Sequence, residues 1–278
     1  MSIRFVAPHD LSTQVWKCFG LSTSDRADRQ RHVERELDRT GLPFEVQIAE
    51  RPTDAGGFAS VGQRGCFDSH LRALRAARDQ DVDVAVIVED DAVIVHRFPD
   101  LLEQVQRELA DHEWSVLLLG YLPLESPSKV FPLELITPHV ARSRHWEFVG
   151  SHFYAVHRSA LDALIADFER RLEPGGHRIG VDGILNEFRF LTASDTLVCV
   201  PNLSRQGPSP SGITVDSGVR TRLLHHAGVR RAVLAVKTVR WNAAARVPAR
   251  PWVAVWNLRA RLLAGRRAEH VERIPGGR

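Results

Sequence analysis

The chain has 278 residues, of which 44% are hydrophobic and 26% are charged, and its net charge is +3. This size and composition exclude a disordered chain and fit one large α/β domain with an appendage. The three cysteines, Cys18, Cys66 and Cys199, are far apart and odd in number, which argues against a disulfide framework and for a reducing compartment. The first residues do not resemble a secretion signal, and no apolar run approaches the roughly 20 residues that span a bilayer. We therefore expect a cytoplasmic protein.

The small net charge conceals an asymmetry along the chain. Residues 220–278 contain 14 Arg and Lys but only two acids, a charge of +12 that leaves −9 on the rest. An acidic body with a basic tail indicates that the tail meets something anionic, with membrane lipid and nucleic acid as candidates. We expect one catalytic domain over residues 1–216 and a basic, helical extension over residues 217–278.

Strands and helices are predicted to alternate from the N-terminus onwards, which favours an α/β fold. In chain order, we expect a strand at Val15–Gly20, a charged helix from about Asp25, a strand at Phe44–Ala49, a loop over 50–60 and a helix from about Gly62. After the central strand we expect a helix at Phe98–Ala110, a strand at Trp114–Tyr121, an irregular segment over 122–144 and a strand at Trp146–Val156. There follow an amphipathic helix through Leu161 and Phe168, a strand at Thr196–Val200, a polar loop to Ile213, and short helices at Val229–Trp241 and Trp252–Leu263.

The centre of the sequence is a buried strand followed by three carboxylates. The run Val84–Val88 is apolar and rich in β-branched residues, which is typical of a strand buried on both faces. Glu89, Asp90 and Asp91 follow where that strand should end, and open α/β sheets bind ligands outside the carboxyl ends of their strands. Adjacent carboxylates repel one another, so we expect a cation beside them, and oxygen ligands favour Mg²⁺ or Mn²⁺. The alternative, a solvated acidic turn, is less favoured because apolar residues 92–95 follow.

Three other residues have both a structural and a functional interpretation. His70 is either a core histidine bonded to backbone or part of a ligand site, and helical spacing puts it on one face with Cys66. His152 is either a metal or diphosphate ligand or a packing residue. Asp182 precedes an apolar run, so it either caps a helix or takes part in chemistry. Cys66 itself is interpreted as a small buried hydrophobe rather than a nucleophile.

Several motifs resemble, in the same order, those of the family 25 glycosyltransferases, the lipooligosaccharide sugar transferases related to collagen galactosyltransferases. The central motif is G-x-x-G-C-x-x-S-H-x-x-A-L from Gly62, followed by V-I-V-E-D-D-A to Ala92. Upstream lie GLSTSDRADRQ and GLPFEV; downstream lie G-x-H-x-Y from Gly150, then Asp182 and PNLSRQGPSPSGI. The resemblance covers roughly residues 15 to 215.

This resemblance implies a GT-A fold, a Rossmann-like α/β/α sandwich. It also implies a metal-dependent, inverting transfer of a hexose, most often galactose, from a UDP-sugar to a hydroxyl of a glycan. Lipooligosaccharide or another cell-surface polysaccharide is the implied acceptor. A lipid-carried glycan would place the acceptor at a membrane, so we expect peripheral binding to an anionic leaflet through the basic extension.

The resemblance also implies roles for individual residues. Asp182 is the candidate catalytic base, with a place in the metal site as its other role. Asp91 and Glu89 are the candidate ligands of Mn²⁺ or Mg²⁺. The candidate donor-binding residues are Arg29 (with Arg26 as the alternative), His70, Glu89, Asp90, His152 and Gln206.

Two other function classes remain open at this point. One is a transferase-like scaffold that has lost catalysis, and the other is a nucleic-acid-associated metal enzyme. Nucleic acid is the less favoured partner, because the body is acidic and lacks aromatics interleaved on a basic sheet.

Overall fold

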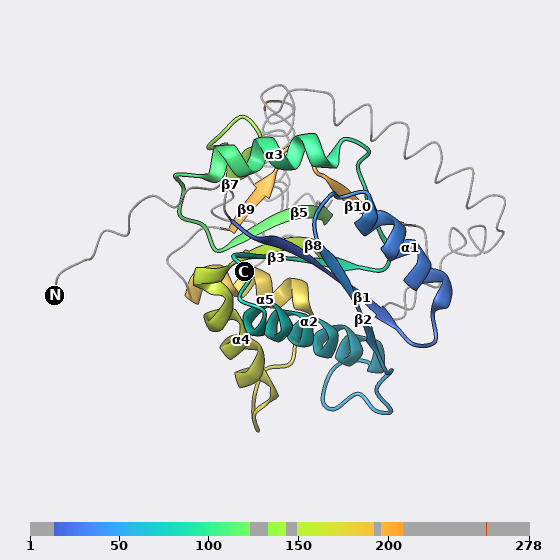
Figure 1. Ribbon diagram of the computed structural model, residues 1–278. Coiled ribbons are helices and arrows are strands. Elements are labelled where there is room, and N and C mark those ends of the chain that lie inside the picture. The colour runs from blue at the N-terminus through green and yellow to red at the C-terminus, as the bar shows by residue number, and fades with distance from the viewer. Residues whose placement is uncertain (1–13, 123–132, 143–148, 192–195, 208–253, 255–278) are drawn as a thin grey trace, which may run out of the picture.

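The structure, a computed structural model, describes residues 14–122, 133–142, 149–191 and 196–207 together with Ala254. Over these ranges helices alternate with the strands of one mixed sheet (Figure 1). The domain boundary expected at residue 217 lies outside the described residues, and so do the two C-terminal helices apart from Ala254. No helix of the described ranges has both the length and the apolar character needed to cross a membrane.

The elements agree closely with those expected from the sequence. The helices are α1 Ala27–Asp38, α2 Val61–Asp79, α3 Phe98–Leu109, α4 Arg158–Leu172 and α5 Val181–Leu191. The larger strands are β1 Trp16–Thr23, β2 Phe44–Ala49, β3 Val84–Glu89, β5 Val116–Leu122, β8 Val149–His157 and β9 Thr196–Cys199. The shorter strands are β4 Ala92–Ile94, β6 Glu134–Leu135, β7 Val140–Arg142 and β10 Ser204–Gln206.

The sheet brings the ends of separated strands to one edge. Its order is β2-β1-β3-β8-β5-β9-β7-β6, and β10 pairs with β4 and β5. Strands β2, β1 and β3 are mutually parallel, whereas β8 runs antiparallel to both β3 and β5. The carboxyl ends of β1 and β3 therefore lie beside the beginning of β8, and this edge carries the candidate site.

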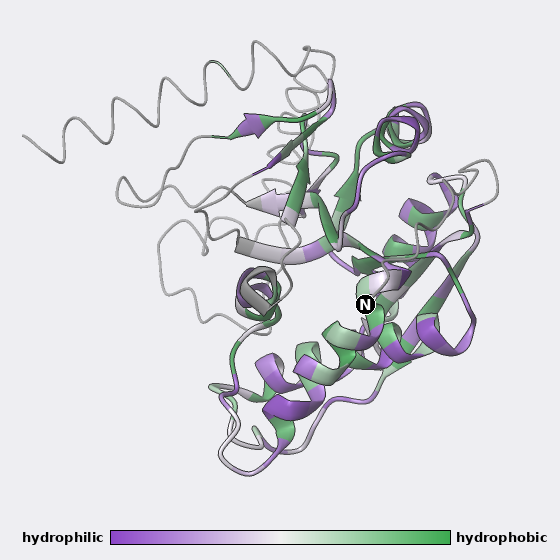
Figure 2. Cartoon of the chain, turned by 90° about the vertical axis from the view of Figure 1, so that its left-hand side faces the viewer, coloured by the Kyte–Doolittle hydropathy of each residue, from purple (hydrophilic) through white to green (hydrophobic). Residues whose placement is uncertain are grey.

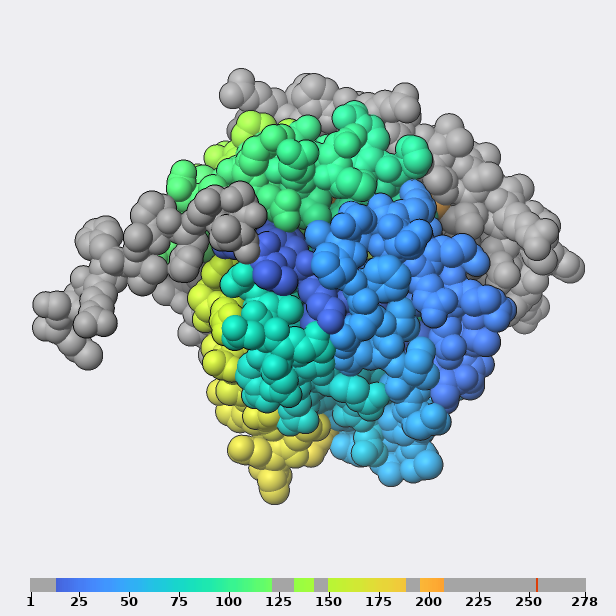
Figure 3. Space-filling view, in the orientation of Figure 1, coloured from blue at the N-terminus to red at the C-terminus, as the bar shows by residue number. Residues whose placement is uncertain are grey.

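Helices cover both faces of the sheet, with α1 and α3 on one face and α2, α4 and α5 on the other (Figure 1). Successive residues of β3 point to opposite faces, so Val84, Val86 and Val88 join one core cluster while Ala85 and Ile87 join the other. Figure 2 shows the consequence: the central strands are mainly hydrophobic, and the helices have one hydrophobic and one hydrophilic side. The expected α/β/α sandwich is confirmed. Figure 3 shows that side chains close the spaces between α1, α2 and α3.

Four short segments form strands that the sequence did not predict. β6 and β7 lie in the segment over 122–144 that was expected to be irregular, and they pair with each other, while β7 also pairs with β9. The other two are β4 and β10. Ser204–Gln206 was expected to be part of a polar loop, but it pairs antiparallel with Ala92–Ile94 and reaches β5 at Gly120. Both segments are only three residues long, so their strand character comes from pairing with each other and not from local pattern. The pairing brings Gln206 next to the acidic residues at the end of β3.

Candidate active site

A cavity of about 360 Å³ lies at the sheet edge where β1 and β3 end. Its walls come from the end of β1, the start of α1, the loop after β2, the first turns of α2, and the three carboxylates after β3. The polar and charged residues of the lining include Ser22, Arg26, Arg29, Arg51, Cys66, His70, Glu89, Asp90, Asp91 and Gln206. The expected gathering of polar residues beyond the central strand is therefore present.

Asp90 is fully engaged by two side chains. Its Oδ2 accepts a hydrogen bond from the Ser22 hydroxyl at 2.6 Å, and its Oδ1 accepts one from Arg29 Nη1 at 2.8 Å. The Arg29 and Asp90 side chains are only 16% and 10% exposed, so the ion pair is largely shielded from water. Asp90 thus fixes Arg29 at the cavity wall, and neither of its oxygens is left without a protein partner.

Glu89 is held by partners from two other elements. Its Oε1 accepts a hydrogen bond from Ser151 Oγ at 2.7 Å and lies 3.2 Å from His70 Nε2. The other ring nitrogen of His70 lies 2.9 Å from the Tyr154 hydroxyl, and the two rings are stacked. His70 is therefore a buried histidine with side-chain partners, and the alternative of a core histidine bonded to backbone is wrong. Next to Ser151, Gly150 has a φ of 101°, which disfavours any residue with a Cβ, and the pairing of β8 with β5 shifts register in the same stretch.

Asp91 has a different environment from its two neighbours. Its Oδ1 is buried, and no group in the described ranges donates a hydrogen bond to it. Burial, followed by the charge of Glu89, raises the pKa of Asp91 to about 7. Its backbone carbonyl accepts a hydrogen bond from Gly207 N, which ties this turn to the end of β10. A buried carboxylate oxygen without a donor is a group that a cation would stabilise.

The first turn of α2 points its positive end towards the same cavity. Ser60 caps the helix by accepting a hydrogen bond from Gln63 N, and the Gln63 side chain accepts one from Ala59 N. This arrangement resembles a capping box, except that the Gln63 side chain bonds the amide of Ala59, before the cap, and not that of Ser60 itself. Gly62 and Gly65 line the cavity in the first turns of the helix, and because they have no side chains they leave space beside the helix backbone. The helix dipole there favours an anion.

His152 does not line the cavity. Its ring is fully buried, and neither nitrogen has a hydrogen-bond partner in the described ranges, although the Ser204 backbone lies near. Burial lowers the pKa of His152 to about 4, so the ring is neutral at pH 7. Direct contact with a ligand in the cavity would require the ring to move, which favours packing over the expected ligand role.

Asp182 is the second residue of α5 and not its cap, so the structural alternative of an N-cap is wrong. Its Oδ1 accepts a hydrogen bond from the next backbone amide, Gly183 N. Asp182 lines a small neighbouring hollow with Gly150 rather than the main cavity. It is nevertheless close enough to Cys66 to contribute, after burial and Glu89, to raising the pKa of that thiol.

Sequence reasoning missed three members of the site, Ser22, Ser151 and Tyr154. Tyr154 and Ser151 lie inside the G-x-H-x-Y motif, but only His152 was assigned a role there. The signal for Ser22 was its place at the end of the first strand, because carboxyl ends of neighbouring parallel strands share an edge. Ser151 could not be found in this way, since an antiparallel strand presents its beginning, not its end, to that edge.

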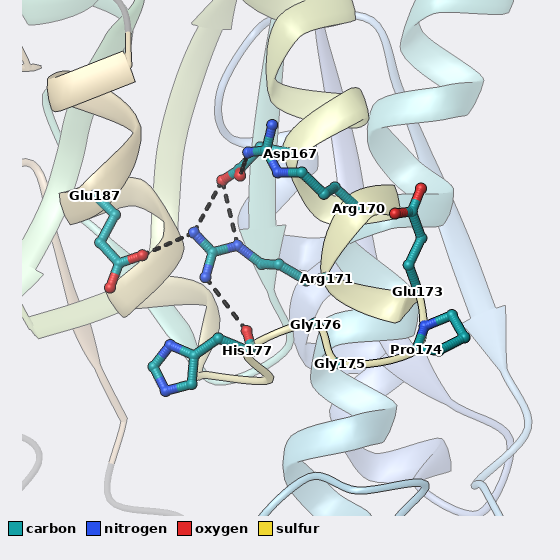
Figure 4. Close-up of a pocket in the computed structure, with 9 residues that line it drawn as sticks. All are labelled: Asp167, Arg170, Arg171, Glu173, Pro174, Gly175, Gly176, His177 and Glu187. Carbon is teal, nitrogen blue, oxygen red and sulfur yellow. Dashed lines mark hydrogen bonds and ion pairs between the residues drawn. The ribbon is translucent and has the colours of Figure 1, made fainter.

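A second and larger cavity, of about 590 Å³, lies between the end of α4 and α5. Figure 4 shows the Arg171 guanidinium between the carboxylates of Asp167 and Glu187. Arg171 also donates to the carbonyl of His177, and Arg170 bonds Asp167. These charges neutralise one another, so the cavity is a less suitable ligand site than the first. We call the group of Asp167, Arg170, Arg171 and Glu187 the clasp, because it ties α4 to α5 and to the loop between them.

The fold and the main cavity together define an α/β protein with an acidic, arginine-flanked site at the carboxyl edge of its sheet. Residues 51–124 match the family model described as glycosyltransferase family 25 (LPS biosynthesis protein). This segment contains the central motif and all three carboxylates, and it confirms the resemblance to family 25. Residues 51–124, and with them the acidic part of the site, are therefore similar to glycosyltransferases.

Comparison with curated proteins finds no match. Among solved structures, a glycosyltransferase involved in the glycosylation of the major capsid of PBCV-1 is similar at 12% identity and a TM-score of 0.43, over 64% of this chain and 77% of its own. A CMP:2-keto-3-deoxy-manno-octonic acid synthetase complexed with CTP is similar at 13% identity and a TM-score of 0.44, over 80% and 99%. A mannose-1-phosphate geranyltransferase from Thermus thermophilus is similar at 10% identity and a TM-score of 0.42, over 67% and 74%.

Proposed function

We propose that the protein is a metal-dependent, inverting glycosyltransferase that moves a hexose from a UDP-sugar to a hydroxyl of a glycan. Galactose is the hexose that the family resemblance favours. The observation that carries the proposal is the buried, donor-free oxygen of Asp91 beside Glu89, in a cavity flanked by arginines. The acceptor we propose is lipooligosaccharide or another cell-surface polysaccharide.

The charges of the cavity support a divalent cation. Five acidic side chains line it, namely Asp25, Glu50, Glu89, Asp90 and Asp91, against three arginines. A nucleotide diphosphate adds further negative charge, so its binding there needs a positive counter-charge. Hard carboxylate oxygens suit Mn²⁺ or Mg²⁺, and such an ion neutralises the charge of the leaving diphosphate.

Asp91 and Glu89 are the residues that would hold this ion. Asp90 is less suited, because both of its oxygens already accept hydrogen bonds from Ser22 and Arg29. Asp91 has an unsatisfied buried oxygen, and Glu89 is oriented by Ser151 and His70. The three successive carboxylates therefore divide into two metal ligands and one residue that positions an arginine.

The positive groups of the cavity suit the donor diphosphate. Arg29 is held in place by Asp90, while Arg26 and Arg51 line the same wall. The N-terminal turn of α2 adds the partial positive charge of its dipole. Gln206 reaches the cavity from β10 and offers an amide to a polar group of the nucleotide or sugar. His70 acts from below the donor by orienting Glu89.

An inverting transfer needs a base against the acceptor hydroxyl. In the step we propose, the acceptor oxygen bonds to the anomeric carbon, the bond from that carbon to UDP breaks, and the hydroxyl proton passes to Asp182. Asp182 lies outside the cavity lining but within electrostatic reach of Cys66, which does line it. This position suits a residue that contacts the acceptor and not the nucleotide.

We further propose that residues 217–278 bind an anionic membrane surface, so that the enzyme is cytoplasmic and peripheral to the inner face of the membrane. The charge of +12 over residues 220–278 supports this, opposite a body that carries −9. A glycan assembled on a lipid carrier would bring the acceptor to the same surface.

A screen of UDP-sugars for Mn²⁺-dependent hydrolysis tests the proposed function, because hydrolysis of the donor needs no acceptor. We expect one UDP-hexose to be hydrolysed with Mn²⁺ and not after chelation. If no UDP-sugar is hydrolysed and UDP does not bind with Mn²⁺ present, the enzyme proposal fails in favour of a scaffold. Equal binding of single-stranded nucleic acid and UDP would favour the nucleic-acid alternative.

A further inference from the structure

Three potential metal ligands of different chemistry meet at the floor of the cavity. The Cys66 sulfur, a ring nitrogen of His70 and a carboxylate oxygen of Glu89 all lie within 4.8 Å of one another. Cys66 and His70 are four residues apart on α2, so they project from one face of the helix, and Glu89 ends the neighbouring strand. Two rigid elements therefore converge on one point.

The outer partners of these ligands are already in place. The Tyr154 hydroxyl holds one ring nitrogen of His70 at 2.9 Å, and the Ser151 hydroxyl holds Glu89 at 2.7 Å. Hydrogen bonds of this kind fix the orientation of histidine and carboxylate ligands in metal sites. Cys66 reaches the cavity, so a cation has a path from solvent.

We propose that Cys66, His70 and Glu89 form a binding site for a thiophilic divalent cation such as Zn²⁺, distinct in chemistry from the hard-cation site at Asp91. Sulfur and nitrogen ligands select Zn²⁺ over Mg²⁺ and Mn²⁺. Bonds of about 2.0–2.3 Å to zinc place tetrahedral ligands roughly 3.3–3.7 Å apart, so the group needs a contraction of about 1 Å. Water from the cavity supplies the fourth ligand.

Binding at this site has a defined proton balance. The Cys66 thiol releases its proton to solvent, and the sulfur binds as the thiolate. His70 binds through Nε2, so the proton that Nε2 donates to Glu89 in the metal-free protein moves to Nδ1, where it faces the Tyr154 oxygen. The hydrogen bond between His70 and Glu89 is replaced by their two bonds to the ion.

The site also shares Glu89 with the Mn²⁺ or Mg²⁺ site proposed above. On that proposed function, Zn²⁺ at Cys66 removes a ligand from the hard-cation site and weakens Mn²⁺-linked UDP binding. Zinc bound to Cys66, His70 and Glu89 would then inhibit the protein without any change in fold.

Titration of the metal-free full-length protein with Co²⁺ tests the site without relying on activity. Thiolate bound to Co²⁺ gives an absorption band in the near ultraviolet that oxygen ligands do not give. We expect this band to saturate at one equivalent and to disappear on addition of Zn²⁺. Cys66→Ser should abolish it, and Cys18→Ala, which removes a thiol buried in the other core cluster, should leave it intact.

The outcomes separate this inference from the proposed function. Absence of the band in the wild type, or its persistence in Cys66→Ser, overturns the zinc site whatever UDP does. A circular dichroism spectrum identical to the wild type shows that Cys66→Ser is folded. Within each variant, UDP affinity with Mn²⁺ is compared with and without one equivalent of Zn²⁺: we expect a loss in the wild type only. An equal loss in both would remove the proposed inhibition.

Discussion

At the scale of single residues, three adjacent carboxylates acquire three different environments. Burial opposes the ionisation of Glu89, but hydrogen bonds from His70 and Ser151 outweigh it and hold the pKa of Glu89 below its ordinary value. Asp90 is paired with Arg29. For Asp91, burial and the charge of Glu89 outweigh the opposing effects of Arg29 and of its own backbone amide, so its pKa is raised. One acidic triplet thus supplies an oriented carboxylate, an arginine anchor and a carboxylate that needs a cation.

The proposed base is tested by Asp182→Asn. We expect the transfer rate to fall roughly 10²–10⁴-fold, the range typical of general acid–base catalysis, because the amide introduced by the substitution cannot accept the proton of the acceptor hydroxyl. UDP affinity should barely change, since Asp182 lies outside the cavity lining. Steady-state kinetics and calorimetry measure the two quantities. If affinity falls together with rate, Asp182 is a donor or metal residue; if only thermal stability falls, its role is structural.

The buried ring of His152 predicts a dependence of stability on pH. Its pKa is lowered to about 4, whereas an unfolded histidine has a pKa of about 6.5. The unfolded state therefore binds the proton first as pH falls, and the free energy of unfolding decreases through this window by up to roughly 3 kcal/mol. Stability from this group is complete above about pH 6.5.

Urea unfolding between pH 4 and 7 measures this effect. We expect His152→Gln to be less stable at pH 7 but to show a shallower loss of stability on acidification than the wild type. The exposed His112 provides the control, because His112→Gln should leave the slope unchanged. Parallel curves for His152→Gln and the wild type would contradict the assignment of a neutral, buried ring.

At the scale of elements, the sequence predicted those helices and strands whose positions are determined by a local pattern of apolar residues. The apolar run of β3 and the stripes of α3 and α4 are periodic, so their positions were predicted to within a few residues. The strands β4, β6, β7 and β10 were missed, because each is only two or three residues long and forms only through its partners. The same limit applied to the site: Glu89, Asp90 and Asp91 are contiguous in sequence, whereas Ser151 and Ser22 join them only through the order of the sheet.

The clasp at the end of α4 shows how elements hold the candidate base in place. Arg171 is 7% exposed and bonds both Asp167 on its own helix and Glu187 on α5. It also holds the carbonyl of His177, in the loop that leads to Asp182. Losing this arginine leaves the buried Asp167 with only Arg170, and removing one partner of a buried ion pair costs about 3–5 kcal/mol.

We therefore expect Arg171→Met to lower the free energy of unfolding by roughly 3 kcal/mol, at the low end of that range because Arg170 remains. Arg75→Met is the matched control, since it breaks the exposed pair between α2 and Glu169 of α4 and should cost at most about 1 kcal/mol. Chemical denaturation measures both variants. Equal losses would show that Arg171 is no more than a surface ion pair.

At the scale of the whole molecule, charge is divided between an acidic body and a basic C-terminal segment. Residues 220–278 carry +12 and the rest carries −9. Each basic residue near an anionic leaflet contributes on the order of 1 kcal/mol, and salt screens the attraction. Contact of even a third of the segment with lipid would outweigh the repulsion expected of the acidic body.

We expect the intact protein to sediment with vesicles containing anionic lipid at low salt and to dissociate at high salt. A chain truncated at Ser217 should stay in solution and keep donor hydrolysis. Neutral vesicles are the control for lipid charge. If the intact protein ignores anionic vesicles at low salt and the truncated chain is insoluble, the segment completes the core of the body and the membrane proposal is wrong.

The central claim is that Asp91 links a divalent cation to UDP binding, and calorimetry of UDP binding with and without Mn²⁺ tests it most directly. We expect Mn²⁺ to strengthen UDP binding to the wild type and to have no effect on Asp91→Asn, which keeps the shape of the side chain but not its charge. Asp79→Asn, at an exposed carboxylate at the far end of α2, should behave as the wild type. Equal Mn²⁺-linked UDP affinity in Asp91→Asn and the wild type would contradict the claim.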